Sequence, residues 1–347
     1  MQNIIRSYNA TVAKIRAMYG KRITPQDYTE LVSRRSVADI AEYLKKNTHY
    51  SEILAPIDTN TVHRGMLENL LRRFNFEMYK KITGFEHISK QEFYNYRLIH
   101  AEIDVILSTI RHINAKSEKQ IADIPIYING MTCFDLIEIA KVRSFNELLE
   151  FLRKTPYYDI LKNEEVDADG KVDYTKCEVK LRTYYLERLE KNISKRGKKE
   201  AEKLNSMILT DVDLINIINS YRMTAFFGEN ETEISKDMLG FYGRLSAAKQ
   251  QEIYSAPDKE EFIKRFSKTY YGRQIAESGG DMNDLEQNAN LLRFRYAKLA
   301  LKSSSTAPVS VYSFMYLMNV ELQNLISIIE GVRYGLPAKE IESLLIM

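Results

Sequence analysis

Three acidic residues stand at comparable places in three similar stretches of the sequence: Glu102, Asp213 and Glu321. Each opens an apolar run with helical spacing, and the runs are residues 102–111, 213–222 and 321–330. A repeated carboxylate could serve as a general base, or it could accept hydrogen bonds as part of the architecture. Because the three acids fall on separate repeats, the sequence favours a structural role, as caps or as hydrogen-bond acceptors within the helix layer.

The other residue types that usually carry catalysis or bind metals form no known pattern. The five histidines have neither HxxxH nor HExxH spacing, and they are His49, His63, His87, His100 and His112. There is no nucleophile elbow, and the glycines form neither a Walker loop nor a dinucleotide-binding fingerprint. The sequence therefore predicts no catalytic residue, no cofactor or cofactor-binding residue, and no metal ligand.

Two further features resemble redox or metal sites but are better explained structurally. Cys133 and Cys177 are too few for a metal cluster or a disulfide framework. Each falls in a predicted helix, which favours buried or half-buried thiols in a reducing cytosol. Residues 167–173, Asp-Ala-Asp-Gly-Lys-Val-Asp, look like the start of a calcium loop. Their glycine comes too early and no bidentate glutamate follows, so we expect a polar turn.

An ending of the form Thr-x-Tyr occurs three times, after an apolar anchor and a basic stretch. The three copies are residues 44–50, 152–157 and 266–271, and their threonines are Thr48, Thr155 and Thr269. Self-similarity at about a third of the chain length indicates that a domain-sized unit was copied. Repeated units tend to build a quasi-symmetric body rather than one asymmetric catalytic cleft.

A pair of short helices is expected before each Thr-x-Tyr ending. The N-caps expected for the first helix are Thr24, Thr132 and Ser246, with Asp27 and Asp135 closing capping boxes. The N-caps expected for the second helix are Ser36, Ser144 and Ser255. A fourth copy of the first segment, residues 336–344, ends the chain. The N-terminal copy lacks a complete acid-headed helix, so we expect the C-terminal helices to complete the first unit in space.

A long, highly charged amphipathic helix is predicted downstream of each ending, over residues 61–82, 174–194 and 283–302. Sustained strict alternation is nearly absent, so the fold class is predicted to be all-α, with three pseudo-repeated lobes and pseudo-threefold symmetry. The expected segments are lobe 1 at 1–93 (completed by 308–347), lobe 2 at 94–205, lobe 3 at 206–307 and C-terminal helices at 308–347. The apolar anchors expected in the last segment are Leu322, Leu325, Ile328 and Leu344.

Composition and charge limit the possible partners. The 347 residues include 50 basic and 47 acidic side chains, a net charge of +3, which argues against a general nucleic-acid binder. The basic run at 195–199 sits at a predicted helix end, where solvated lysines are common. Residues 1–19 lack the apolar core of a signal peptide, and the most apolar stretch, 309–329, is interrupted by polar residues. We therefore expect membrane contact only through a partner.

The order of these motifs resembles a known family over nearly the whole chain. The features that carry the resemblance are the opening at 8–16 (Tyr-Asn-Ala-Thr-Val-Ala-Lys-Ile-Arg), the Thr-x-Tyr endings, and the closing run at 320–331 (Val-Glu-Leu-Gln-Asn-Leu-Ile-Ser-Ile-Ile-Glu-Gly). Together they are similar to the C subunit of archaeal and bacterial A/V-type rotary ATPases, whose counterpart in the eukaryotic V-type enzyme is the d subunit. One departure is Glu330, where family members often carry an arginine, and the nearest arginine here is Arg333.

The resemblance implies a funnel-shaped helical body of three lobes, mounted on the membrane proteolipid ring at the cytoplasmic face. The rotating central shaft would plug into its mouth, and the chain would couple that shaft to proton or sodium transport without an active site of its own. Two alternatives from other classes remain. The chain could be a helical adaptor or scaffold with no rotary role, or an enzyme whose residues converge from different repeats.

Overall fold

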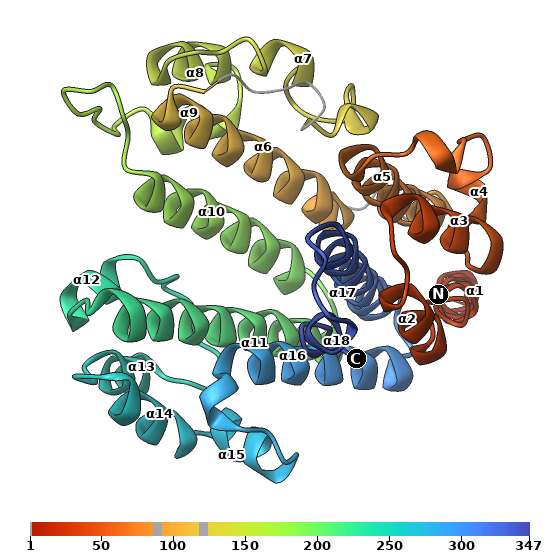
Figure 1. The fold of residues 1–347 in the computed structure, drawn as a ribbon. Coiled ribbons are helices and arrows are strands. Elements are labelled where there is room, and N and C mark those ends of the chain that lie inside the picture. Colours follow the sequence, from red (N-terminus) through yellow and green to blue (C-terminus); the bar gives the residue numbers. More distant parts are fainter. Residues whose placement is uncertain (1, 86–91, 118–123) are drawn as a thin grey trace. The chain divides into compact units, whose positions relative to one another are not determined.

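The computed structural model describes residues 2–85, 92–117 and 124–347. Within these ranges the chain is helical, and its one β-type pairing is an isolated bridge between Val166 and Val172 (Figure 1). The all-α prediction is therefore confirmed. The pseudo-threefold, funnel-like arrangement of the lobes remains a prediction.

The chain forms two compact units. Unit 1 combines Met1–Ser89 with Arg273–Met347, and unit 2 is the continuous segment Lys90–Gly272. Unit 1 thus takes its helices from two separate segments of the sequence, whereas all of unit 2 comes from one continuous segment. The four segment boundaries expected from the repeats remain a prediction.

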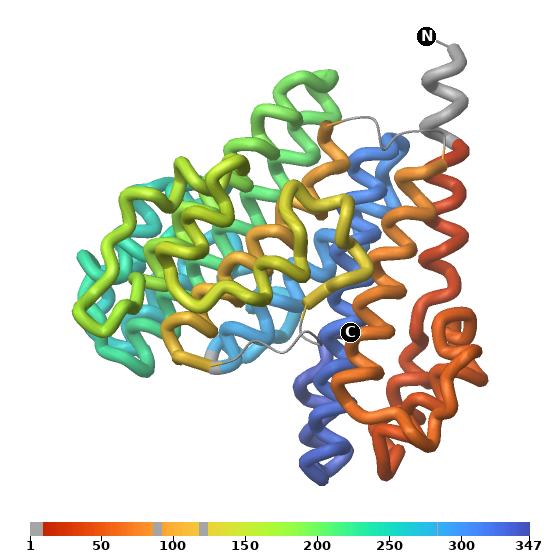
Figure 2. Tube along the Cα trace, turned by 90° about the horizontal axis from the view of Figure 1, so that it is seen from above, coloured from red at the N-terminus to blue at the C-terminus, as the bar shows by residue number. Residues whose placement is uncertain are grey.

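Unit 1 is built around three helices that lie side by side: α1, α5 and α17 (Figures 1 and 2). Its helices are α1 (Gln2–Tyr19), α2 (Pro25–Val32), α3 (Val37–Asn47), α4 (Ser51–Leu54), α5 (Arg64–Thr83), α16 (Leu285–Ser303), α17 (Ala307–Arg333) and α18 (Ala338–Ser343), with short 3-10 turns at Thr59–Thr61 and Met282–Asp284. The helix α15 (Tyr270–Glu277) crosses the boundary between the units. The most buried helix is α17, and its apolar residues run around most of its circumference, as expected for a helix with neighbours on several sides.

Unit 2 contains three long helices, α6, α10 and α11, which run next to one another (Figure 1). Its helices are α6 (Tyr96–Ala115), α7 (Leu136–Ile139), α8 (Phe145–Leu152), α9 (Pro156–Leu161), α10 (Tyr174–Ser194), α11 (Lys198–Arg222), α12 (Glu231–Lys236), α13 (Ala247–Tyr254) and α14 (Lys259–Ser267), with 3-10 turns at Glu92–Asn95 and Ile126–Ile128 and a π-turn at Met223–Phe227. The predicted long charged helices are confirmed, because α5, α10 and α16 match the three expected ranges to within about three residues at each end.

The helices that carry the three acids begin earlier than the sequence suggested. Glu102, Asp213 and Glu321 all lie within the bodies of α6, α11 and α17, more than one turn after each helix has begun. A carboxylate in a helix interior cannot cap its own helix, because the unpaired N–H groups are confined to the first turn. Of the two structural roles considered, only hydrogen bonding to other segments is left.

Most predicted helix caps are correct. Thr24 caps α2 and forms a complete capping box with Asp27. The side chains of Ser36, Ser144 and Ser246 accept hydrogen bonds at the starts of α3, α8 and α13, respectively.

Two predicted caps are wrong for a local reason. The Thr132 hydroxyl donates to the carbonyl of Phe134, and α7 is capped instead by Asp135, which accepts from the backbone of residues 137 and 138. Similarly, Ser255 follows the end of α13, while Asp258 caps α14 by accepting from the Glu261 backbone at 2.8 Å. In both cases a carboxylate three residues downstream is the cap.

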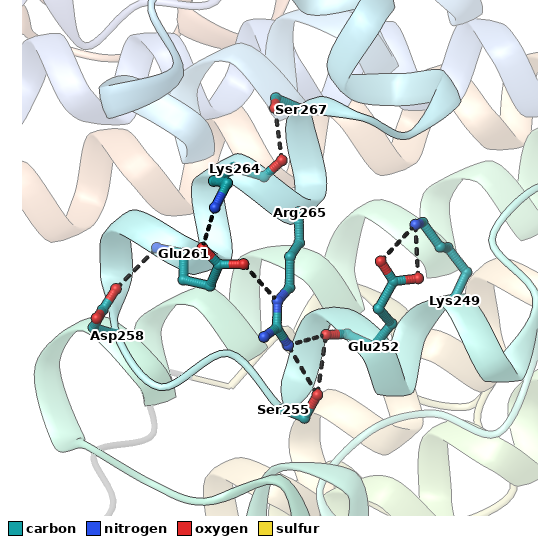
Figure 3. Close-up of polar contacts among 8 residues, drawn as sticks. All are labelled: Lys249, Glu252, Ser255, Asp258, Glu261, Lys264, Arg265 and Ser267. Carbon is teal, nitrogen blue, oxygen red and sulfur yellow. Dashed lines mark hydrogen bonds and ion pairs between the residues drawn. The ribbon is translucent and has the colours of Figure 1, made fainter.

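The α13–α14 pair is joined by a network around Arg265 (Figure 3). Its guanidinium donates to the carbonyl of Glu252 at 2.6 Å and to the Ser255 hydroxyl at 2.9 Å, so it satisfies the carboxyl end of α13 from a side chain of α14. The same guanidinium donates to Glu261 at 3.2 Å. These contacts orient α13, which carries two residues of the site described next.

Candidate functional site

The three repeated acids are buried carboxylates. Glu102 and Glu321 are each 6% exposed, and Asp213 is fully buried. An ionised carboxylate in such a place is costly unless hydrogen-bond donors surround it. Each acid together with its donors is called here a carboxylate cluster, named after the acid.

In the Glu102 cluster, α6 is tied to two later segments of unit 2. The backbone N–H of Cys133, in the turn before α7, donates to Glu102 Oε1 at 2.6 Å. The hydroxyl of Tyr157, on α9, donates to Oε2 at 2.5 Å. Each oxygen therefore accepts from a different element, and the carboxylate holds both against α6.

The Asp213 cluster has the most donors of the three. Backbone N–H groups of Gly243, Arg244 and Leu245, just before α13, donate to the carboxylate at 2.9, 2.8 and 3.1 Å. The Tyr271 hydroxyl donates to Oδ2 at 2.8 Å. Three consecutive N–H groups converging on one carboxylate form a concave anion-binding turn, filled here by a side chain of the same unit.

Two features of α13 and its approach complete the Asp213 cluster. Gln250 Nε2 donates to Asp213 Oδ1 at 3.1 Å, and the side-chain oxygen Oε1 of Gln250 accepts from the Tyr254 hydroxyl at 2.6 Å. At Gly243 a side-chain Cβ would lie 2.6 Å from Asp213 Oδ2 and 2.8 Å from the carbonyl of Leu209. Glycine is therefore required at this position so that the backbone can reach the carboxylate.

The Glu321 cluster lies in unit 1 and joins the two ends of the sequence. The backbone N–H of Ile23 donates to Glu321 Oε2 at 2.9 Å, and the Tyr50 hydroxyl donates to Oε1 at 2.9 Å. His49 Nε2 also lies 2.9 Å from Oε1, and both side chains are 6% exposed. The middle residue of the Thr-x-Tyr motif is proline in the second copy and tyrosine in the third, so an imidazole is found only in this cluster.

All three clusters share one chemical plan, and it explains the repeated motif. Each motif tyrosine is buried and donates to the acid. Each motif threonine donates its hydroxyl to the carbonyl of the apolar anchor before it, at 2.7–2.8 Å; the pairs are Thr48 with Leu44, Thr155 with Leu152, and Thr269 with Phe266. The threonine thus closes the end of one short helix and presents the tyrosine to the carboxylate.

The electrostatics of the clusters suit binding of donors rather than proton transfer. Burial is the main cause that raises the pKa values of Tyr50 and Tyr157, and the charge of the neighbouring glutamate raises them further. Both phenols therefore stay protonated and keep donating at neutral pH. Burial raises the pKa of Asp213, although its backbone donors and Tyr271 act in the opposite direction. Protein donors contact the carboxylate oxygens in all three clusters, an arrangement that fits the hydrogen-bonding role that the sequence favoured.

Sequence reasoning found the acids and the tyrosines but not their partnership. The missed members are backbone N–H donors and the side chains His49, Gln250 and Tyr254. The one usable signal was position, since a backbone donor lies within one residue of each predicted first-helix cap, at Ile23, Cys133 and Leu245.

Three of the remaining histidines, His63, His100 and His112, make separate local contacts. His63 caps α5 by accepting from the Met66 backbone, and His100 pairs with Asp104 at 2.9 Å. His112 contacts the Ser117 hydroxyl at 3.0 Å, and His87 lies outside the described residues. Among the residues that the structure describes, no group of three or more His, Cys, Asp or Glu side chains could hold a metal ion.

The two cysteines have different environments. Cys177 is buried on α10, as expected, and burial raises its thiol pKa to about 12. Cys133 was expected in a helix, but it lies in the turn before α7 and is exposed. That turn is non-helical because the Cys133 backbone N–H is directed to Glu102 and because α7 starts later, after Asp135.

The polar turn at 167–173 is confirmed. Asp167 accepts from the backbone of Asp169 and Lys171, and Gly170 has a positive φ of 78°. The basic run at 195–199 extends from the end of α10 into the first turn of α11, which begins at Lys198. Within it, Lys195 pairs with Glu92 at 2.9 Å and Arg196 with Glu200 at 2.9 Å.

Comparison with known proteins places this arrangement in a family. A family model described as ATP synthase (C/AC39) subunit matches residues 11–344. The chain belongs to the ATP synthase (C/AC39) subunit family. The resemblance seen in the sequence motifs is therefore confirmed, and the match extends over both units and all three carboxylate clusters.

Relatives of the C/AC39 chain include several proteins named as the C subunit of an A-type ATP synthase. The Methanocaldococcus jannaschii protein is 25% identical over 96% of this chain and 85% of its own length. The Methanosphaera stadtmanae protein is 22% identical over 98% of this chain and 88% of its own length. The Archaeoglobus fulgidus protein is 22% identical over 95% of this chain and 94% of its own length.

Two further properties bear on the role of this C/AC39 chain. In the described residues no helix is long and apolar enough to cross a membrane, and α17, which covers the most apolar stretch, carries the buried Glu321 and Asn324. Glu330, which departs from the expected arginine, contacts Arg64 of α5 and lies 3.9 Å from Arg333. The acid at that position therefore takes part in packing α17 against α5.

Proposed function

We propose that this chain is the non-catalytic central-stalk subunit of a rotary ATP synthase, coupling the rotating shaft to the membrane proteolipid ring. Its membership of the ATP synthase (C/AC39) subunit family over residues 11–344 is the observation that carries the proposal. The curated relatives are named as subunits of A-type ATP synthases. In this role the chain is peripheral, lies at the cytoplasmic face and contacts the membrane only through partners, in a complex that moves protons or sodium ions.

The carboxylate clusters support a mechanical role. A subunit that transmits torque needs short helices fixed firmly to long ones, and each buried carboxylate fixes two separate segments to one helix. Hydrogen bonds to a buried charge are also expensive to break, because the carboxylate would be left unpaired in a dry site. The same plan in three helices gives a body that resists deformation at three places.

The test is coupling in membranes prepared from cells that lack the chain. ATP hydrolysis by the head is expected to continue there, while ATP-driven ion uptake into vesicles is lost. Adding back the purified chain should restore ion uptake and co-purification with the proteolipid ring. If the chain fails to bind the ring and to restore uptake, the rotary role is wrong, and an adaptor or scaffold role becomes the better explanation.

A single substitution separates the coupling role from an enzymatic one. Glu321→Gln keeps one acceptor for Tyr50 or the Ile23 backbone but turns the other oxygen into a donor, so stability should fall. Coupling by each assembled complex should nevertheless stay near the wild-type level. Loss of turnover with normal assembly and normal stability would show that Glu321 takes part in chemistry.

A further inference from the structure

Two adjacent phenylalanines are largely exposed at the end of an acid-bearing helix in unit 2. Phe226 is 72% exposed and Phe227 is 74% exposed, and both belong to the π-turn Met223–Phe227 that follows α11. Single exposed apolar residues are ordinary on a protein surface, but two neighbouring large aromatics are not. The turn thus displays a compact aromatic surface that this unit leaves uncovered.

The π-turn is an insertion relative to the other acid-bearing helices. All three end at a residue with positive φ: Lys116 after α6, Gly228 after the π-turn and Gly335 after α17. Lys116 and Gly335 lie equally far along the chain from Glu102 and Glu321, whereas Gly228 lies one residue farther from Asp213. A π-turn accommodates one extra residue, and such insertions are frequent at functional sites.

The corresponding position in unit 1 also displays an aromatic ring. Tyr334 precedes Gly335 as Phe227 precedes Gly228, and it is 70% exposed. Leu336, which follows Gly335, is 39% exposed. In the remaining repeat the residue before Lys116 is Ala115, so this feature occurs in two of the three copies.

The chain directly after the phenylalanines is acidic. Glu229, Glu231 and Glu233 are exposed, and Lys236 is paired with Glu233 at 2.9 Å. Burial and the negative charges of Asp173, Glu233 and Glu229 raise the pKa of nearby Asp237. The aromatic pair is therefore bordered by a local excess of negative charge, which opposes binding to anionic lipid or to nucleic acid.

We propose that Phe226, Phe227 and the acidic residues after them form a docking surface for the proteolipid ring. The contact chemistry on the ring is an apolar pocket bordered by lysine or arginine side chains on its exposed loops. Buried aromatics with complementary charges around them are the usual anchors of protein interfaces. The ring is favoured over the shaft because equivalent aromatic positions recur in this chain, and a partner made of identical copies offers the same pocket repeatedly. The inference rests on the proposed function.

The first test measures binding of the full-length chain to purified, detergent-solubilised proteolipid ring. Phe226→Ser with Phe227→Ser should weaken binding at least about tenfold, the loss typical of interface anchors. Its matched control is Leu299→Ser on α16, because Leu299 is 61% exposed but lies elsewhere. Circular dichroism and melting curves should match wild type in both variants, since the side chains removed are exposed.

A second test addresses the charges. Glu229→Lys with Glu231→Lys should also weaken ring binding, and raised salt should weaken the wild type more than this variant. The matched control is Glu187→Lys with Glu190→Lys, exposed acids on α10. Equal binding by wild type and the charge-reversed variant would contradict the proposed pocket.

The outcomes separate this inference from the proposed function. If wild type does not bind the ring, the proposed function fails, and the docking surface fails with it. If wild type binds and the Phe226, Phe227 variant binds equally well, only the docking surface is wrong. Purified shaft subunits and phosphatidylserine vesicles serve as alternative probes. Loss of binding to either in the same variant, with ring binding intact, would overturn the assignment to the ring.

Discussion

Each motif tyrosine donates a hydrogen bond to a buried acid, but the three acids do not depend on their tyrosines equally. Asp213 also accepts from three backbone N–H groups and Gln250, whereas Glu102 accepts from the backbone of Cys133 and from few other groups. The cost of losing a donor rises when few donors are left, because the buried charge is then poorly solvated.

Replacing the tyrosines in unit 2 should reveal this difference. Tyr157→Phe should lower the free energy of unfolding by about 1–3 kcal/mol, whereas Tyr271→Phe should cost only about 0.5–1.5 kcal/mol. Urea denaturation of the two variants provides the comparison, and both residues belong to the same unit. The opposite ranking would mean that the number of donors does not control stability here.

The raised pKa of Asp213 predicts the pH dependence of stability. Burial is its main cause, so the folded protein holds this proton more tightly than the unfolded chain, whose ordinary value is 3.8. Ionisation of Asp213 therefore opposes folding, and stability falls as the pH rises from 3.8 through the raised value. Asp213→Asn removes this titration. Urea denaturation at a series of pH values should show wild type losing stability relative to the variant over that window, and a relative gain would contradict it.

At the scale of elements, α18 depends on one buried anchor. Ile341 is fully buried and packs beside Gly331 of α17, where an added Cβ would lie 2.6 Å from it. The sequence pointed instead to Leu344, which is wrong because Leu344 is 52% exposed, while Leu322, Leu325 and Ile328 are buried as expected. Leu344 follows the last residue of α18, Ser343, so it does not continue the helix face on which Ile341 is buried.

Ile341, within α18, and Leu344, just after it, provide a matched pair of substitutions. Ile341→Ala should destabilise unit 1 by about 2–5 kcal/mol, because it empties a filled site. Leu344→Ala should change stability by no more than about 0.5 kcal/mol. Thermal melting followed by circular dichroism measures both, and similar losses from the two substitutions would show that α18 packs differently.

The elements were more predictable than the contacts between them. Helix type follows from local periodicity, so the ranges of α5, α10 and α16 could be read from the sequence. Ser255 and Asp258 are both good N-cap residues, so the sequence alone does not show at which of them α14 begins. The hydrogen bond from Tyr50 to Glu321 joins residues separated by most of the chain, and no local sequence pattern predicts it. Backbone donors such as Ile23 and Leu245 are invisible in the sequence, because every residue except proline has one.

At the scale of the whole molecule, the two units differ in how much of the chain each needs. Unit 2 contains complete Glu102 and Asp213 clusters, whereas the Glu321 cluster needs both ends of the sequence. A fragment of residues 90–278, which keeps α15 whole, should fold alone with a cooperative thermal transition. A fragment of residues 1–89 should not, because Tyr50 and His49 then lack their carboxylate.

Co-expression provides the control for these fragments. Residues 273–347 supplied as a separate chain should restore helical structure to residues 1–89 and co-purify with them, since the contacts of α17 with α1 and α5 need no covalent link. The Glu321→Ala form of the C-terminal fragment should restore less. Independent folding of residues 1–89 would contradict the division into two units.

The two-ended construction of unit 1 also sets the order in which the protein can be made. Ribosomes add about 5–20 residues per second, so roughly 10–50 s pass between the synthesis of Ser89 and that of Glu321. Unit 2 can fold during that interval, while Tyr50, Leu67 and Leu71 emerge before the helix that buries them exists. The nascent chain therefore exposes an apolar N-terminal segment until α17 has been synthesised, and it should need a chaperone most during that time.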